Sequence, residues 1–210
     1  ITVLFSDGEE TGLLGAAAYL HDPQMRAQTG AMINVEARGN SGPSLLFQTS
    51  PGDEKLVDLY ARASTHYATS SLYAEIYKRL PNDTDLTPAL QAGIAGYNFA
   101  FIGNLAHYHT TRDRLENIDP RSVQQHGDNV VAVADALSWA NLDDLKGSDA
   151  IYLDILGRFL PRLPRDWALP LSLACFAIVA LAGFITRETD SRRGLSAFLA
   201  PLLLIAGCLA

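Results

Sequence analysis

Residues 1–20 read ITVLFSDGEETGLLGAAAYL, an apolar run followed by an acidic turn and then by a segment rich in alanine and leucine. β-Branched and aromatic residues favour strands, whereas alanine and leucine favour helices. We therefore expect a buried strand over residues 1–5 and a helix from Thr11 to Leu20. In open α/β sheets ligands bind beyond the carboxyl ends of the strands, and the acidic turn lies at such an end.

Strand-like and helix-like segments alternate along the rest of the first 150 residues. Strands are expected over residues 31–36, 44–49 and 97–103, and helices over residues 51–69, 72–79, 85–91 and 120–141. The last helix follows Asp119 and has Pro120 at its first position, which is a typical helix start. The alternation of strands and helices predicts an α/β fold in which helices cover a sheet.

The last 60 residues are more apolar than the rest. Residues 167–185 contain no formal charge and would extend about 28 Å as a helix, close to the hydrocarbon thickness of a bilayer. A second apolar run, residues 194–210, follows a polar stretch that contains three arginines. We expect two membrane spans, the second one truncated, in a multi-pass integral membrane protein whose preceding domain is non-cytoplasmic. A buried helical hairpin of a soluble protein is the alternative.

The charge is unevenly distributed. The net charge is −7, and residues 1–150 hold 10 Lys and Arg against 19 Asp and Glu. A nucleic-acid partner requires a basic surface, so this acidic domain argues against one. Both cysteines, Cys175 and Cys208, lie in the apolar runs. A metal in the first 150 residues would therefore be held by His, Asp and Glu.

Three expected loops offer side chains that bind metals. Glu9 and Glu10 lie in the acidic turn, Glu36 ends the second strand, and His107 and His109 follow the last strand. Carboxylates and imidazoles at neighbouring strand ends can form half of a zinc site. Each also has a structural alternative: the paired glutamates complement a helix dipole, Glu36 is a solvated strand end, and the histidines are structural.

Four strings in a fixed order carry a resemblance to a known family: ITVLFSDGEETGLLGAAAYL, NVEARGNSGPSLLFQTS, NDTDL and HYHTTRDRLENIDP. Over about residues 1–142 the sequence resembles the co-catalytic zinc aminopeptidases, in particular their membrane-embedded branch of vacuolar membrane and endoplasmic-reticulum metallopeptidases. The resemblance implies a three-layer α/β sandwich with a mixed, mostly parallel central sheet, whose N-terminal part is missing here, followed by transmembrane helices. Residues 1–147 would be the C-terminal part of the catalytic domain, residues 148–166 a juxtamembrane linker and residues 167–210 the transmembrane region.

The resemblance also implies roles by position. Glu9 corresponds to the general base that takes a proton from the metal-bound water and returns it to the leaving amine. Glu10 corresponds to a ligand of one zinc ion, and Glu36 to a ligand of the other, at a position where soluble members have Asp. His109 corresponds to the family's histidine ligand, with His107 as the alternative.

Two further acids are expected near the site. Asp85 corresponds to an acid near the substrate pocket, and Asp113 to a turn-forming or histidine-orienting acid. The family's other ligands, a histidine and the bridging aspartate, would precede Ile1, so we expect two zinc ions in the full-length protein and no activity from these residues alone. The implied function is a membrane-anchored exopeptidase that removes N-terminal residues from peptides. A non-catalytic peptidase-like binding domain and a glutaminyl-cyclase-like acyltransferase with one zinc are the alternatives.

Overall fold

The structure is a computed structural model that describes residues 1–187. It contains two compact units, residues 1–163 and the segment from Pro164 onward. The first unit contains every candidate site residue. The second predicted membrane span, residues 194–210, lies outside the described residues.

The first unit is built around a sheet of β1 (Ala31–Ala37), β2 (Leu45–Thr49) and β3 (Ala95–Phe101). β3 lies in the middle, parallel to β1 and antiparallel to β2, so the sheet is mixed. Every residue of β3 is buried, as expected for an apolar central strand. The strand predictions for these three segments are confirmed to within two residues.

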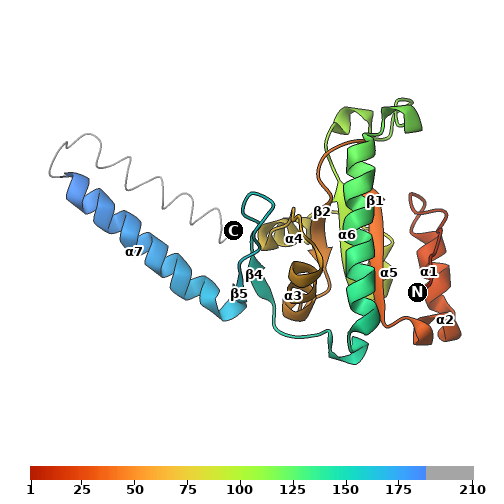
Figure 1. Ribbon diagram of the computed structural model, residues 1–210, viewed down its shortest axis with the longest axis horizontal. Coiled ribbons are helices and arrows are strands. Elements are labelled where there is room, and N and C mark those ends of the chain that lie inside the picture. The colour runs from red at the N-terminus through yellow and green to blue at the C-terminus, as the bar shows by residue number, and fades with distance from the viewer. Residues whose placement is uncertain (188–210) are drawn as a thin grey trace. The chain divides into compact units, whose positions relative to one another are not determined.

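Helices cover both faces of this sheet. They are α1 (Leu14–His21), α2 (Pro23–Gln28), α3 (Glu54–Ala63), α4 (Ser71–Tyr77), α5 (Leu86–Gln91) and α6 (Pro120–Trp139). Tyr97 and Phe99 of β3 pack in the larger core, together with α3 and α6. The alternate position Gly96 faces Leu86 of α5, because successive residues of a strand point to opposite faces. Figure 1 shows α3 and α1 on opposite sides of the sheet.

The start of α6 confirms its prediction. The carboxylate of Asp119 accepts a hydrogen bond from the amide of Arg121 at 2.9 Å, and Pro120 occupies the first helical position. Such a cap satisfies one of the amides that a helix leaves without a partner at its N-terminus.

α3 is shorter than the helix predicted over residues 51–69, and its N-terminus differs. Asp53 directly precedes the helix without capping it. Its carboxylate instead accepts hydrogen bonds from the hydroxyl of Thr49 and the amide of Ala150, both at 2.8 Å. The acid thus joins β2 to a distant part of the chain.

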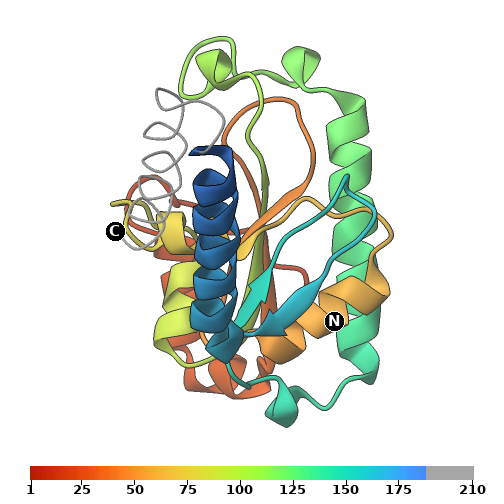
Figure 2. The ribbon, with the colours of Figure 1, turned by 90° about the vertical axis from the view of Figure 1, so that its left-hand side faces the viewer.

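The expected linker covers residues 148–166, and residues 148–163 of it belong to the first unit. They contain β4 (Ala150–Tyr152), which pairs with β5 (Arg162–Pro164) in a second, two-stranded sheet (Figure 2). Ala150, Tyr152 and Leu160 are buried in the larger core. Because these side chains are removed from water against the main sheet, the segment is part of the folded unit.

Residues 1–5 do not form the predicted strand. Ile1, Val3 and Phe5 are 98%, 73% and 93% exposed, and no strand among the described residues pairs with them. A strand needs a neighbouring strand to satisfy its backbone groups and cover its side chains. Strand propensity alone was therefore insufficient here, and the prediction is wrong.

The second unit contains α7 (Ala168–Arg187), which follows a short 3₁₀ turn (Arg165–Trp167). By length and composition, Arg165–Gly183 is the one helix among the described residues that could cross a membrane. A core helix of a soluble protein can meet the same criteria, but few residues of this helix are buried. The predicted span over residues 167–185 thus coincides with a helix.

Replacing Phe99 with alanine tests the position of the core. Phe99 is fully buried, and its loss is expected to lower the free energy of unfolding by about 3–5 kcal/mol through lost contacts and a cavity. Trp139→Ala is the control, because Trp139 is 86% exposed and its loss should change stability by less than about 0.5 kcal/mol. Urea unfolding in detergent, followed by circular dichroism, measures both. Equal effects of the two substitutions would contradict the assigned core.

Candidate metal centre

The acidic turn is held against the first turn of α1, at the end of the sheet where β1 and β3 finish (Figure 1). The amide of Gly15 donates a hydrogen bond to the carbonyl of Asp7 at 2.8 Å. A Cβ atom at position 15 would lie 2.7 Å from the Asp7 nitrogen, closer than real Cβ atoms approach backbone. Glycine is thus required for the packing that places Glu9 and Glu10.

Glu10 meets His109, although 99 positions separate them in sequence. The Nε2 atom of His109 lies 2.5 Å from Oε1 of Glu10. The imidazole also stacks on the ring of Tyr108, with 3.8 Å between the ring centres. His109 has a φ of 54°, and such strained backbone is concentrated at functional sites. The structure therefore brings two of the predicted ligands into contact.

His107 has a different environment. Its Nδ1 atom lies 2.6 Å from Nδ2 of Asn40, a residue that is 2% exposed. Asn40 belongs to the loop after β1, and that loop passes so close to the loop after β3 that a Cβ atom on Gly39 would lie 2.1 Å from the carbonyl oxygen of Gly103. His107 thus links the two loops, whereas His109 contacts the acidic turn.

Four carboxylates at this end of the sheet influence one another. Burial raises the pKa of Glu36 from its ordinary 4.5 to about 7; a hydrogen bond from Asn34 opposes the shift, and the charges of Glu9, Asp85 and Glu10 add to it. Burial likewise raises the pKa of Glu9, with Glu10 and Asp85 adding to the effect and His109 opposing it. Because like charges and desolvation both disfavour the ionised forms, a cation between these groups would be favourable.

The two accessory acids differ from each other. Asp85 is 6% exposed; its Oδ2 atom accepts a hydrogen bond from the hydroxyl of Ser6, and its Oδ1 atom has no hydrogen-bond partner among the described residues. Asp113 is exposed, and its amide donates to the carbonyl of Thr110 at 3.0 Å. The structure thus brings Asp85 to the carboxylate cluster and leaves Asp113 in a surface turn.

The donor types fit zinc better than the geometry does. Carboxylate oxygens and imidazole nitrogen are ordinary zinc ligands, and catalytic zinc usually has three protein ligands. Glu10 and His109 form a pair, but no three His, Cys, Asp or Glu side chains of the described part of the chain converge closely enough to hold one ion. The residues present therefore supply suitable donors and a negative field, but a partial coordination shell.

Sequence reasoning missed the residues that surround these groups. Tyr108 lies on the loop that also carries His109. The guanidinium of Arg38 lies 5.6 Å from the centre of its ring. Asn34 donates a hydrogen bond to Glu36 at 3.1 Å. No sequence signal reveals the Arg38–Tyr108 contact, because the two residues lie in separate loops. Asn98 is different, since one asparagine inside the apolar run YNFAFIG is a visible irregularity.

Comparison with known proteins finds a matching family model and similar protease sequences. The model of the family described as Peptidase family M28 matches residues 1–134. The chain is 31% identical to endoplasmic reticulum metallopeptidase 1 of Homo sapiens over 171 residues, which cover 78% of this chain and 19% of that protein. It is 30% identical to the vacuolar membrane protease of Yarrowia lipolytica over 176 residues, which cover 83% of this chain and 17% of that protein. The chain thus spans about a fifth of the length of these relatives, and no solved structure matches it.

Glu36→Gln tests the crowding of carboxylates. The pKa of Glu36 is higher in the folded state than in the unfolded state. Its contribution to the free energy of unfolding is therefore fully present below pH 4.5 and is lost as the pH rises through about 7. In the presence of EDTA at pH 8, Glu36→Gln is therefore expected to unfold about 2–4 °C higher than the wild type, a shift that corresponds to roughly 1 kcal/mol. At pH 4.5 the difference should vanish.

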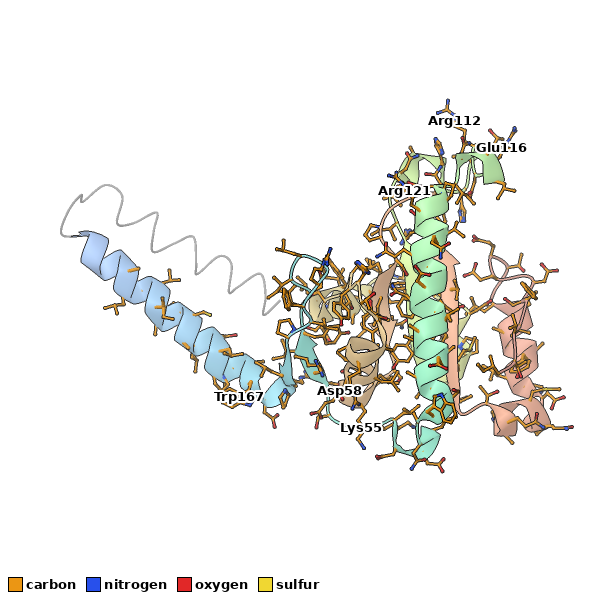
Figure 3. The ribbon with its side chains drawn as sticks, viewed as in Figure 1. Lys55, Asp58, Arg112, Glu116, Arg121 and Trp167 are labelled. Atoms are coloured by element: carbon orange, nitrogen blue, oxygen red, sulfur yellow. The ribbon has the colours of Figure 1, made fainter. Side chains whose placement is uncertain are left out.

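The matched control is Glu116→Gln, because Glu116 is exposed in the loop that precedes α6 (Figure 3). Thermal melts of the three proteins at both pH values, followed by circular dichroism, make the comparison. A Glu36→Gln variant that is less stable than the wild type at pH 8 would contradict the repulsion.

Proposed function

The chain belongs to peptidase family M28, and on this premise we propose that it carries part of the active site of a zinc-dependent, membrane-anchored aminopeptidase. The single observation that supports the proposal most is the contact between Glu10 and His109 at 2.5 Å, beside the half-buried Glu9 and Glu36. It joins the two sequence motifs expected to supply a metal site. The substrates would be peptides with a free N-terminus.

In the proposed centre, Glu10, Glu36 and His109 hold zinc, with two ions in the full-length protein. Zinc, when bound, polarises the peptide carbonyl and makes a coordinated water more acidic. The chain's own contribution is to place carboxylate and imidazole donors at one edge of the sheet. The contact of His109 with Tyr108 keeps the imidazole directed toward Glu10.

Glu9 is the proposed general base. Its carboxylate takes a proton from the attacking water and delivers it to the nitrogen of the leaving amine. Burial and the neighbouring acids raise the pKa of Glu9, which brings the group closer to the pH at which it must both accept and release a proton. Asp85 lies near enough to contribute to this shift, and we assign it to the substrate side of the site, whereas Asp113 has a turn-forming role.

The proposed architecture extends beyond the described sheet. We propose a three-layer α/β sandwich with a mostly parallel sheet for the complete domain, to which residues 1–163 contribute the C-terminal part. Membrane anchoring is supported by the apolar helix Arg165–Gly183 and by relatives named as endoplasmic reticulum and vacuolar membrane proteins. The catalytic domain would face the non-cytoplasmic side, with a second span after α7.

Glu9→Gln separates chemistry from metal binding. In the full-length protein purified in detergent, we expect hydrolysis of aminoacyl-nitroanilides to fall by about 10²–10⁴-fold, because the proton transfer is lost. The zinc content, measured by elemental analysis, should remain that of the wild type. Glu116→Gln is the control with unchanged activity. A metal-free and inactive wild type would indicate a peptidase-like binding domain instead.

His109→Ala and His107→Ala distinguish the two candidate histidines. Loss of His109 should remove zinc from the centre, because this imidazole contacts Glu10, and ligand loss leaves too few donors. Loss of His107 breaks a contact with Asn40 and should leave the zinc content unchanged. Elemental analysis and thermal melts of both variants provide the comparison, and the opposite pattern would transfer the ligand role to His107.

A further inference from the structure

Three side-chain amides form a row across the sheet. Asn34 of β1 lies opposite Asn98 of β3, and Asn98 lies opposite Gln48 of β2. The Nδ2 atom of Asn34 donates to Oδ1 of Asn98 at 3.0 Å, and Nδ2 of Asn98 donates to Oε1 of Gln48 at 2.9 Å. The row lies on the α5 face of the sheet, between the small apolar cluster and the carboxylates.

The central amide has one orientation in which its groups are satisfied. Asn98 is fully buried, and its Nδ2 atom also donates to the hydroxyl oxygen of Thr84 at 2.7 Å. Both amide hydrogens therefore point to acceptors, and the carbonyl oxygen points to Asn34. Reversing this amide alone would set its Oδ1 atom against Oε1 of Gln48, two acceptors, and its NH₂ group against that of Asn34, two donors, which costs free energy at a buried position.

The orientation of Asn98 determines that of Asn34. Because Oδ1 of Asn98 is an acceptor, the NH₂ group of Asn34 must face it. The same NH₂ group also donates to Oε1 of Glu36 at 3.1 Å. Reversing Asn34 would direct its carbonyl oxygen at the carboxylate of Glu36, which repels it. Asn98 thus acts on Glu36 through one intervening side chain.

The other branch of the row leads toward Asp85. Besides the bond from Asn98, the Thr84 hydroxyl accepts a hydrogen bond from the amide of Leu86 at 3.3 Å. Asp85 lies between these two residues at the start of α5, and it belongs to the carboxylate cluster through its effect on Glu36. One buried amide is therefore connected to two acids of the candidate centre.

We propose that Asn98 is a positioning residue of the metal centre, which fixes the Glu36 carboxylate through Asn34 and the backbone that carries Asp85 through Thr84. The proposal rests on the proposed function, in which Glu36 is a zinc ligand. It assigns Asn98 no contact with metal or substrate. An apolar side chain at this buried position would avoid the desolvation of an amide, but it would remove the acceptor that holds the NH₂ group of Asn34 in place beside Glu36.

The test is the zinc affinity of the full-length protein, measured by competition with a chromophoric chelator. Asn98→Ala is expected to weaken zinc binding by about 10–100-fold, the usual effect of removing a group that orients a ligand. Asn129→Ala is the matched control, because Asn129 is also a buried asparagine, 4% exposed, but lies on α6. This control should bind zinc as the wild type does.

A double-mutant cycle distinguishes positioning from general destabilisation. In a Glu36→Ala background, Asn98→Ala should weaken zinc binding no further, because the proposed zinc ligand that it positions is gone and Asp85, the other acid, is assigned to the substrate side. A purely structural role would lower affinity equally in both backgrounds. Thermal melts identify folded variants, and Asn98→Ser, whose side chain is too short to reach Asn34, replaces Asn98→Ala if the alanine variant does not fold.

Each outcome decides the proposal. Weaker binding in Asn98→Ala, wild-type binding in Asn129→Ala and no further loss in the Glu36→Ala background support it. Wild-type affinity in folded Asn98→Ala or Asn98→Ser overturns the positioning role while the proposed function stands. A wild-type protein that binds no zinc overturns the proposed function, and the positioning role with it.

Discussion

The parallel pairing of β1 with β3 is the constraint on which the candidate centre depends. The paired positions run from Ala31 opposite Ala95 to Ala37 opposite Phe101, so both strands finish at the same edge. A slip of one residue would turn Glu36 to the other face of the sheet. Antiparallel pairing would carry the loop with His109 to the opposite end. The relative positions of these side chains are therefore determined by the backbone hydrogen bonds of a buried strand, and the side chains need no contact of their own to come together.

This edge of the sheet is unfavourable for the folded state in two ways. Burial and mutual repulsion raise the pKa values of Glu9 and Glu36, so ionised carboxylates there oppose folding. His109 adds a backbone conformation that non-glycine residues seldom adopt. Proteins break local rules of this kind mainly where function requires it. Crowded carboxylates beside an imidazole would be stabilised by a bound cation, which is the physical basis of the metal centre proposed above.

The sequence predicted the helices and strands whose local residue pattern is enough to specify them. β1, β2 and β3 follow from their apolar runs, and α6 follows from Asp119 and Pro120. Residues 1–5 have the same apolar character but form no strand, because a strand also needs a partner that local composition does not reveal. The apolar residues of segment 148–163 show no regular helix or strand spacing, yet Tyr152 and Leu160 are buried in the core. At the site, the motif predicts His109 as the ligand with His107 as the alternative; the structure adds that His107 contacts Asn40, 67 positions away in sequence, whereas His109 contacts Glu10.

The amide row shows why a buried site depends on more than its charged residues. A β-bulge between Leu46 and Gln48 shifts the register of β2, so that Gln48, and not the intervening Phe47, lies opposite Asn98. Bulges often redirect side chains next to active sites, and this one supplies the acceptor that orients the central amide. The order of dependence therefore runs from an irregularity in β2, through Asn98 and Asn34, to the carboxylate of Glu36. Among these residues only Glu36 carries a side chain typical of a zinc ligand, and on the proposal above a change at any of them would alter the candidate metal centre.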